Sequence, residues 1–302
     1  MNFDLGEVLI RAWQITWKHR ILWVFNMFPV LLSFLFIPVV FIPMFFIGPN
    51  SLINQDFVDQ PYYVSLFIGI NLFLTVLSVL LYAAGSSSAS LGILRSEAGR
   101  GRLSFQDLFQ DGLAFFWRIL GVSVLVGAVV TVVYLLLFGC MMLFGMATMG
   151  LGMICLQPLF LLLYPVVLLV YALVEQSQAA VVADNMSVFE ALARGWVLIR
   201  ENFWRFVLVS LVIYFGIFIL SSIVMLPLML PFFFLPVLME SSQSTMNLQT
   251  FGWISLIFSL VLLPVLTLVQ GISLTFMKSA FMLIYLRLTR STGLQTASQP
   301  VS

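Results

Sequence analysis

The chain has 302 residues, of which 62% are hydrophobic and only 8% are charged, and its mean hydropathy is +1.13. Soluble domains carry about 25% charged residues, so this composition excludes a soluble protein and predicts an all-α polytopic membrane helix bundle. The formal net charge of +1 gives no reason to expect nucleic acid as a partner.

The N-terminal segment, residues 2–18, has polar side chains at helical spacing and predicts an amphipathic helix at the membrane interface. The apolar stretch 21–47 follows and is long enough to span, because about 20 residues cross a bilayer. Pro29, Pro38 and Pro43 predict a kink or break in this first span. The first twenty residues mix acidic and basic side chains, so we expect no cleavable signal peptide.

Five more apolar stretches are long enough to cross a membrane: residues 63–94, 119–147, 153–182, 206–238 and 251–287. A glycine-containing turn at residues 149–152 is expected between the third and fourth spans. Two further amphipathic helices are expected before the third and fifth spans, within residues 95–118 and 184–206. The small, polar tail at residues 291–302 is expected to be flexible.

The distribution of charge predicts the orientation of these six spans. All 13 Lys and Arg residues precede the first span, lie between spans two and three or four and five, or follow from Lys278 onward. With six spans, these four segments share one side of the membrane. The other three loops carry only Asp56, Asp59 and Glu240 as charged residues. The positive-inside rule therefore predicts cytoplasmic N- and C-termini.

Similar segments recur along the chain and indicate an internal repeat. Glu7–Trp13 and Glu190–Trp196 share the pattern Glu-x-Leu-x-Arg-small-Trp. A looser middle copy begins near Asp107, and its Phe116–Arg118 matches Phe203–Arg205 after a gap of four residues, about one helical turn. We therefore expect one transmembrane domain, residues 1–290, with three parallel units of an interfacial helix plus a two-span hairpin. The units cover about residues 1–94, 95–182 and 183–290.

Two charged residues within the predicted spans are candidates for a polar site. Glu175 is the one acid in a span, and Lys278 is the one lysine in the sixth. Intramembrane charges usually face protein or a water-filled cavity; alternatively, each side chain reaches the headgroups separately from near the cytoplasmic end of its helix. Because partial burial makes an unpaired charge costly, we expect the two residues to face each other.

The repeat adds further residues to this candidate intramembrane site. Aligning Tyr82 with Tyr171 places Ser86 opposite Glu175, and aligning the arginines that end the second and sixth spans places Lys278 opposite Ser86. Gln270 lies on a polar face of the sixth span that is in phase with Lys278. The run of small residues 85–90 indicates either a polar groove or close helix packing. The site predicted from these patterns comprises Glu175, Lys278, Ser86 and Gln270.

Motifs of catalysis and metal binding are missing from the sequence. The single histidine, His19, lies in a basic run, and Cys140 and Cys155 are expected to be small buried residues in apolar stretches. We therefore expect no catalytic residue, no cofactor site and no metal site. Four tryptophans lie at predicted cytoplasmic boundaries and are explained by an aromatic belt: Trp13, Trp117, Trp196 and Trp204.

At Glu175, Ser187–Trp196 and Arg200–Trp204 the sequence resembles a bacterial six-span membrane family. This family includes the membrane domain fused to some glycerophosphodiester phosphodiesterases and related integral membrane proteins. The resemblance implies a six-span fold in the bacterial cytoplasmic (inner) membrane. The catalytic barrel of some relatives is absent from this sequence, so no phosphodiesterase residue is carried over.

Two functions therefore remain open. The first is a non-enzymatic membrane module, meaning a scaffold, an accessory protein or a lipid-associated protein, with membrane lipids and an unidentified membrane protein as partners. The second is a transporter or lipid-handling protein with a polar intramembrane cavity; a membrane enzyme is less well supported than either. A continuous polar cavity would favour transport, whereas a filled polar core would favour the module.

Overall fold

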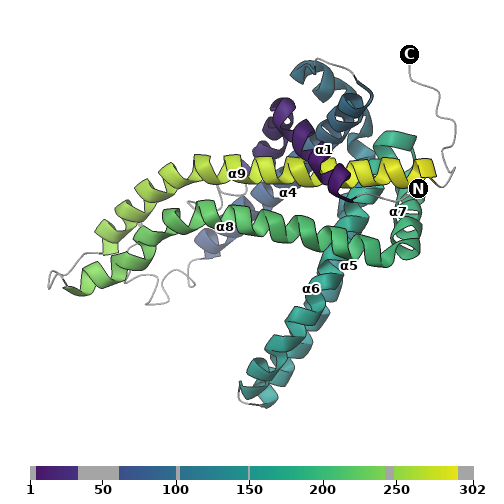
Figure 1. Cartoon of the computed structure of the whole chain (residues 1–302). Coiled ribbons are helices and arrows are strands. Elements are labelled where there is room, and N and C mark those ends of the chain that lie inside the picture. The colour runs from purple at the N-terminus through teal and green to yellow at the C-terminus, as the bar shows by residue number, and fades with distance from the viewer. Residues whose placement is uncertain (1–4, 33–60, 100–102, 149, 242–247, 292–302) are drawn as a thin grey trace. The chain divides into compact units, whose positions relative to one another are not determined.

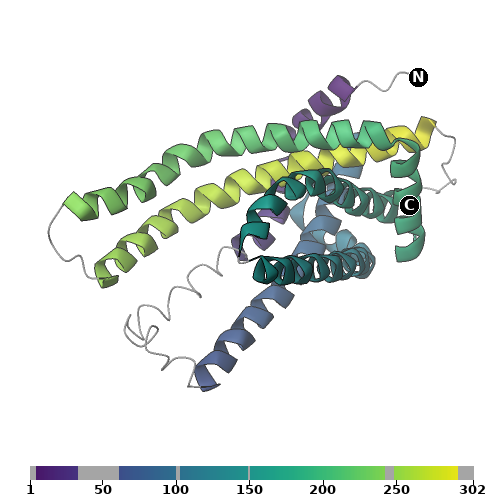
Figure 2. The same ribbon diagram turned by 90° about the horizontal axis from the view of Figure 1, so that it is seen from below.

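A computed structural model describes residues 5–32, 61–99, 103–148, 150–241 and 248–291. These residues are almost entirely helical and contain no strand (Figures 1 and 2). The helices are α1 (Leu5–Lys18), a short helix at Ile21–Leu32, α4 (Pro61–Glu97), α5 (Phe105–Ala147), α6 (Leu151–Asp184), α7 (Val188–Glu201), α8 (Phe203–Ser241) and α9 (Leu248–Ser291).

Five of the described helices contain stretches that are long and apolar enough to cross a membrane: Ser65–Glu97, Phe105–Ala147, Leu163–Asp184, Phe203–Val224 and Leu262–Thr289. The chain is therefore an all-α, multi-pass membrane protein. The predicted first span begins with the helix Ile21–Leu32, and its remainder lies outside the described residues. The tail from residue 292 onward also lies outside them.

Two expectations about the third span need correction. The middle amphipathic helix is not separate from this span, because α5 runs unbroken from Phe105 to Ala147. This stretch contains no proline, and nothing else interrupts its backbone hydrogen bonding.

Cys140, expected to be buried, is exposed. The cause is that one side of a span can be covered by lipid rather than by protein.

The turn predicted between the third and fourth spans is confirmed in place but is shorter than expected, because Leu151 and Gly152 already belong to α6. Helix α5 ends at Ala147 and α6 begins at Leu151. Gly150 between them has a left-handed backbone with φ 90°, a conformation that glycine adopts without steric cost. Its amide donates to the carbonyl of Gly145 at 2.8 Å, which closes the end of α5.

Helix α7 begins with a capping box. The Ser187 backbone amide donates to Glu190 Oε2 at 3.1 Å, and the Ser187 hydroxyl donates to the same oxygen at 2.8 Å. Both interactions favour the ionised carboxylate. The backbone hydrogen bond first, and the side-chain hydrogen bond second, lower the pKa of Glu190 below its ordinary value.

This lowered pKa predicts a pH dependence of stability. Because the folded protein holds Glu190 at a lower pKa than the unfolded chain, its stabilisation is present above the unfolded pKa and is lost as pH falls through the folded pKa. We expect the gap in melting temperature between wild type and Glu190→Gln to be largest near neutral pH and to shrink below about pH 4. Thermal unfolding in one detergent across this pH range measures it. Glu201→Gln, at the other end of α7, is the control, and a gap that did not change with pH would contradict the prediction.

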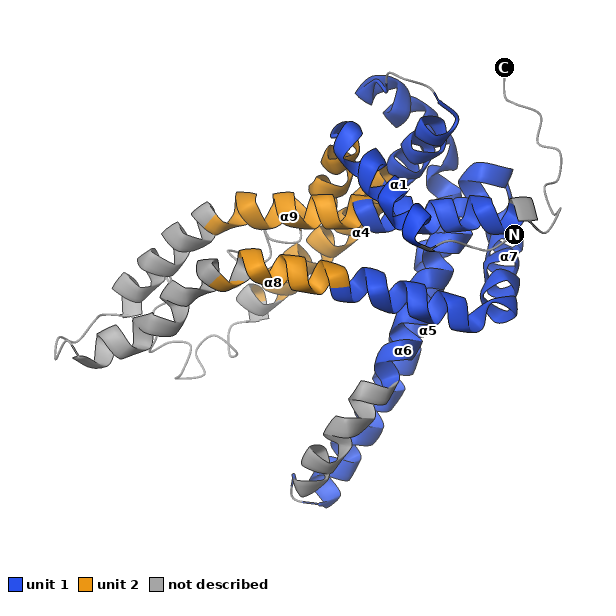
Figure 3. Cartoon of the chain, viewed as in Figure 1, with its two compact units in different colours: residues 1–21, 86–215, 276–302 blue, residues 22–85, 216–275 orange. Residues whose placement is uncertain are grey.

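The contacts of the chain form two compact units (Figure 3). Unit 1 comprises residues 1–21, 86–215 and 276–302, and unit 2 comprises residues 22–85 and 216–275. Each unit collects segments that are far apart in the sequence, so neither is a consecutive domain. The single domain expected over residues 1–290 stays a prediction.

Within unit 1, two glycines bring helices into backbone contact. A Cβ atom on Gly112 of α5 would lie 2.6 Å from Ser88 Oγ and 2.9 Å from Ser88 Cα in α4. A Cβ atom on Gly195 of α7 would lie 2.7 Å from Ser177 Oγ in α6. At Gly112 the added atom would meet the backbone of Ser88, so only glycine fits at that crossing. At Gly195 the atom in the way is a side-chain hydroxyl, and the nearest backbone atom, Ser177 N, would lie 3.3 Å away, so a larger residue would require Ser177 to rotate.

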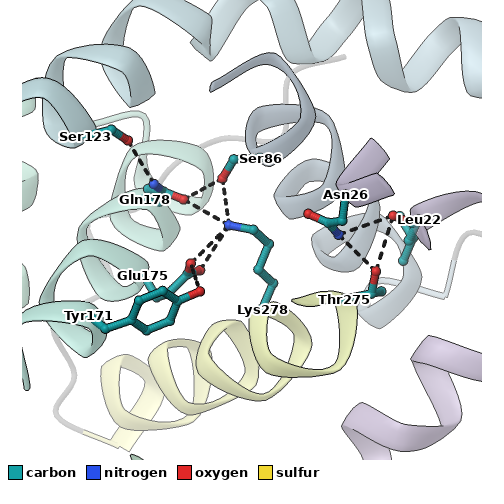
Figure 4. Close-up of polar contacts among 9 residues, drawn as sticks. All are labelled: Leu22, Asn26, Ser86, Ser123, Tyr171, Glu175, Gln178, Thr275 and Lys278. Atoms are coloured by element: carbon teal, nitrogen blue, oxygen red, sulfur yellow. Dashed lines mark hydrogen bonds and ion pairs between the residues drawn. The ribbon is translucent and has the colours of Figure 1, made fainter. Parts of the chain in front are cut away.

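Within unit 2, the helix Ile21–Leu32 packs closely on α4. Pro29, which lies four residues after Phe25, has no backbone N–H to donate to the Phe25 carbonyl. A Cβ atom on Gly85 of α4 would lie 2.3 Å from this carbonyl oxygen. Asn26 Nδ2 also donates to Thr275 Oγ1 of α9 at 2.9 Å (Figure 4). The glycine contact and this buried hydrogen bond hold the short helix in place.

Candidate functional site

Glu175 of α6 and Lys278 of α9 form an ion pair inside unit 1. The Lys278 ammonium lies 3.1 Å from Glu175 Oε1 and 3.3 Å from Oε2. The side chain of Lys278 is only 1% exposed and that of Glu175 only 3%. The charges therefore face each other within the protein rather than reaching separately toward lipid headgroups.

Ser86 and Gln178 complete the surroundings of the ammonium. Lys278 Nζ donates to Ser86 Oγ at 2.8 Å and to Gln178 Oε1 at 3.3 Å, and the Ser86 hydroxyl donates to the same Gln178 oxygen. Gln178 Nε2 then donates to Ser123 Oγ at 3.2 Å. These bonds join α4, α5, α6 and α9 around one buried positive charge (Figure 4).

Tyr171 supports the carboxylate from the same helix, one turn before it. Its hydroxyl donates to Glu175 Oε1 at 2.8 Å, so this oxygen receives both an N–H and an O–H donor. The Tyr171 ring packs edge-to-face on Tyr214 at 5.4 Å between centroids and against Phe281 at 6.2 Å. Hydrogen bonds of this kind are what a buried ion pair needs to offset its desolvation. We call Ser86, Ser123, Tyr171, Glu175, Gln178 and Lys278 the polar cluster.

Three of the four residues predicted from the sequence meet in the polar cluster: Glu175, Lys278 and Ser86. Gln270 lies half-buried in the part of α9 that belongs to unit 2, so the structure does not group it with them. The run of small residues 85–90 serves both purposes considered for it. Ser86 joins the polar cluster, whereas Gly85 and Ser88 provide close packing.

Gln178, Ser123 and Tyr171 are in the polar cluster but were not among the residues predicted for the site. A signal for Gln178 was present, because residues 175–178 read Glu-Gln-Ser-Gln and form an uninterrupted polar run in a predicted span. All four are between 0% and 4% exposed. Gln178 lies three residues after Glu175 and therefore shares its helix face. Ser123 and Tyr171 carried no comparable signal, because single hydroxyls are common in apolar helices.

A second set of polar contacts closes a ring through five helices of unit 1. We call this ring the collar. Arg11 of α1 pairs with Glu97 of α4 at 3.1 Å, and Arg287 of α9 pairs with Glu7 of α1 at 2.8 Å. The remaining contacts are Arg95 of α4 with Asp111 of α5, Arg118 of α5 with Asn185 at the end of α6, and Asp184 of α6 with Tyr285 of α9.

The collar and the polar cluster differ in their expected energetic weight. Most collar side chains are partly exposed; Glu7, for example, is 66% exposed. Exposed ion pairs contribute about 0–1 kcal/mol each because water screens them. The polar cluster is buried, so removing one charge leaves its partner without compensation. The collar therefore links the helix ends, and breaking the ion pair of the polar cluster should cost more than breaking an exposed collar contact.

The residues of the polar cluster have little capacity to react with or bind another molecule, because their charges already pair with each other. Both charges are hydrogen-bonded to each other, and Lys278, Glu175, Ser86 and Gln178 are at most 4% exposed. Protein atoms rather than solvent therefore surround them. Within the described ranges, no group of three or more His, Cys, Asp or Glu side chains could hold a metal ion.

The chain matches no model of a known protein family, no curated protein and no solved structure. The resemblance to the membrane domain of glycerophosphodiester phosphodiesterases stays a prediction.

Proposed function

We propose that this protein is a non-enzymatic module of the bacterial cytoplasmic membrane, a scaffold, accessory or lipid-associated protein whose polar core is closed. It has six spans in three parallel repeats, with both termini in the cytoplasm. The observation that carries the proposal is that the polar cluster is buried and that its charges are paired with each other. Its ion pair is satisfied by protein groups and is almost completely buried.

A transporter would need the opposite arrangement. Polar groups that handle a solute must be reachable by water or by substrate from at least one side of the membrane. Lys278 instead donates to three side chains of the protein itself, at Ser86, Glu175 and Gln178. This filled core favours the module over the transporter alternative.

Two matching crossings support the repeat. Ser88 and Ser177 each lie six residues after the aligned tyrosines, Tyr82 and Tyr171. Each serine contacts the glycine of the amphipathic segment that follows it, Gly112 in one case and Gly195 in the other. Two segments of unrelated origin would have no reason to share both this spacing and this contact.

The collar supports the prediction that the four Lys- and Arg-bearing segments lie on the same side of the membrane. Arg11, Arg95 and Arg287 come from three of the four Lys- and Arg-bearing segments. Asn185, the partner of Arg118, comes from the fourth. Since these contacts require the four segments to lie together, the positive-inside rule assigns them jointly to the cytoplasm.

Chemical labelling of single cysteines tests the closed core. In a Cys140→Ala/Cys155→Ala background, we expect Ser86→Cys to resist a small water-soluble thiosulfonate in inside-out membrane vesicles. The reason is that Ser86 is 1% exposed and lies against Lys278. Glu201→Cys, at the exposed end of α7, should react in the same vesicles. Mass spectrometry of the modified protein measures both.

Two further measurements make the labelling decisive. Ser86→Cys should react after denaturation, which shows that the thiol is present and free. Glu201→Cys should be protected in right-side-out vesicles if its segment is cytoplasmic. Rapid reaction of Ser86→Cys in the folded protein would reveal a water path to the polar cluster and would replace the module with the transporter.

A further inference from the structure

A tryptophan followed by a basic residue occurs three times where an amphipathic segment meets the next apolar stretch. The pairs are Trp17-Lys18, Trp117-Arg118 and Trp204-Arg205. Trp17 lies ten residues after Glu7, and Trp117 lies ten residues after Asp107, which is the matching acid of the middle copy. Trp204, in the third pair, lies fourteen residues after Glu190, which is the same ten residues plus the four-residue gap of the repeat. We call these the three Trp–cation pairs.

Each tryptophan of the pairs is held by a neighbouring aromatic ring but keeps an open surface. Trp17 packs edge-to-face on Trp13 with centroids 5.5 Å apart. Trp117 packs in the same way on Phe116 at 5.2 Å, and Trp204 on Phe203 at 5.6 Å. The three tryptophans are 43%, 74% and 74% exposed, respectively. The rings are therefore oriented by the protein and presented outward.

The adjacent cations are also accessible. Arg118 Nη1 donates to the backbone carbonyl of Asn185 at 3.0 Å, and Arg205 Nη1 donates to Asn202 Oδ1 at 3.2 Å. Arg118 Nη1 also donates to the side-chain oxygen of Asn185. A guanidinium has five N–H donors in a planar fork, so contacts made by Nη1 alone leave other donors for an anion. Lys18 is exposed at the end of α1.

We propose that each Trp–cation pair binds the headgroup of an anionic phospholipid in the cytoplasmic leaflet. An indole places its ring at the headgroup boundary and offers its N–H there, while an adjacent Arg or Lys meets the phosphate. Helices α5 and α8 continue directly from their pairs into membrane spans, which puts the pairs at headgroup depth. This inference rests on the proposed function and names the lipid class for a lipid-associated protein.

The continuity with the spans is why lipid, rather than an acidic protein, is the expected occupant. A protein partner would have to cover exposed rings at three separate helix junctions. The bilayer surface meets all of them at once, because every membrane span passes through it. An anionic headgroup supplies negative charge at the same depth, and each nearby Lys or Arg is worth about a fivefold preference for it.

Fluorescence quenching by brominated lipids tests the proposal on the full-length chain. In vesicles of phosphatidylcholine and phosphatidylglycerol, we expect brominated phosphatidylglycerol to quench tryptophan more than brominated phosphatidylcholine at the same mole fraction. Lys18→Gln/Arg205→Gln should lose most of this preference, and adding Arg118→Gln should abolish it. In wild type the preference should weaken in 1 M salt, where the Debye length falls from about 10 Å to about 3 Å.

The control is Arg200→Gln, which removes an exposed cation of α7 that follows Ile199 rather than a tryptophan. It should keep the wild-type preference. A double variant that keeps the preference, or an Arg200→Gln variant that loses as much, overturns the proposal. The double variant leaves the collar intact, so a folding defect of the triple variant does not prevent a decision. Protection of Ser86→Cys from labelling is independent of lipid choice, so a failure here is separate from a failure of the closed core.

Discussion

Replacing Lys278 with methionine should destabilise the protein by about 3–5 kcal/mol, because it leaves the carboxylate of Glu175 buried without its counter-charge. Glu175 is 4% exposed, and the remaining donor given by the polar cluster is the Tyr171 hydroxyl at 2.8 Å. One neutral hydrogen bond cannot replace an ammonium beside a carboxylate that is buried to this extent.

Glu175→Gln should cost less than Lys278→Met. The ammonium that it leaves behind still donates to Ser86 Oγ at 2.8 Å and to Gln178 Oε1 at 3.3 Å. These two oxygens are neutral, so they compensate the positive charge only in part. The difference in stability between the two single variants therefore measures how well the surrounding polar groups stabilise each charge when its partner is removed.

The double variant Glu175→Gln/Lys278→Met should be more stable than Lys278→Met alone. Removing both charges from a buried pair is often close to neutral, whereas removing one is not. The double-mutant cycle, measured by thermal or denaturant unfolding in one detergent, gives the coupling between the residues. Additive effects would show that the two charges act separately, and the polar cluster would lose its role as the core of unit 1.

The pairing of Glu175 with Lys278 could be anticipated because charged residues are rare in the spans. The chain has 25 formally charged residues, 13 basic and 12 acidic, and few lie in apolar stretches. A lone acid and a lone lysine at matching depth leave few alternatives. The helices could be predicted for a different reason. A continuous apolar stretch of this length can form few structures other than a membrane-spanning helix.

The collar could not be predicted, because its residues have many possible partners. Glu7 and Arg11 are four residues apart on one helix, a spacing at which opposite charges can pair. The structure directs them to different helices, Glu7 to Arg287 and Arg11 to Glu97. Which of several exposed charges meet depends on how helices far apart in sequence lie side by side, and no local pattern encodes that.

The positions of the close helix crossings were equally hidden in the sequence. Helix α5 contains several glycines; Gly112 follows Asp111 in its amphipathic part and Gly127 lies between Val126 and Ala128. Neither setting by itself indicates which glycine meets another helix. In the structure they differ completely. A Cβ atom on Gly112 would meet the backbone of Ser88, whereas one on Gly127 would have nothing within 4 Å. The contrast gives a matched pair of substitutions in one helix.

Gly112→Ala should destabilise the protein by about 1–3 kcal/mol, although alanine is the better helix former by up to about 1 kcal/mol. The added methyl would lie 2.9 Å from Ser88 Cα and 3.0 Å from Ser88 N, and backbone atoms cannot move aside as a flexible side chain can. Relief requires α5 to separate from α4, which would stretch the hydrogen bond between Gln178 and Ser123 of α5. Gly127→Ala should be neutral or stabilising by up to about 1 kcal/mol, since it gains helix propensity without a clash. Unfolding of both variants in one detergent measures the difference, and equal stability would mean that α4 and α5 do not cross at Ser88.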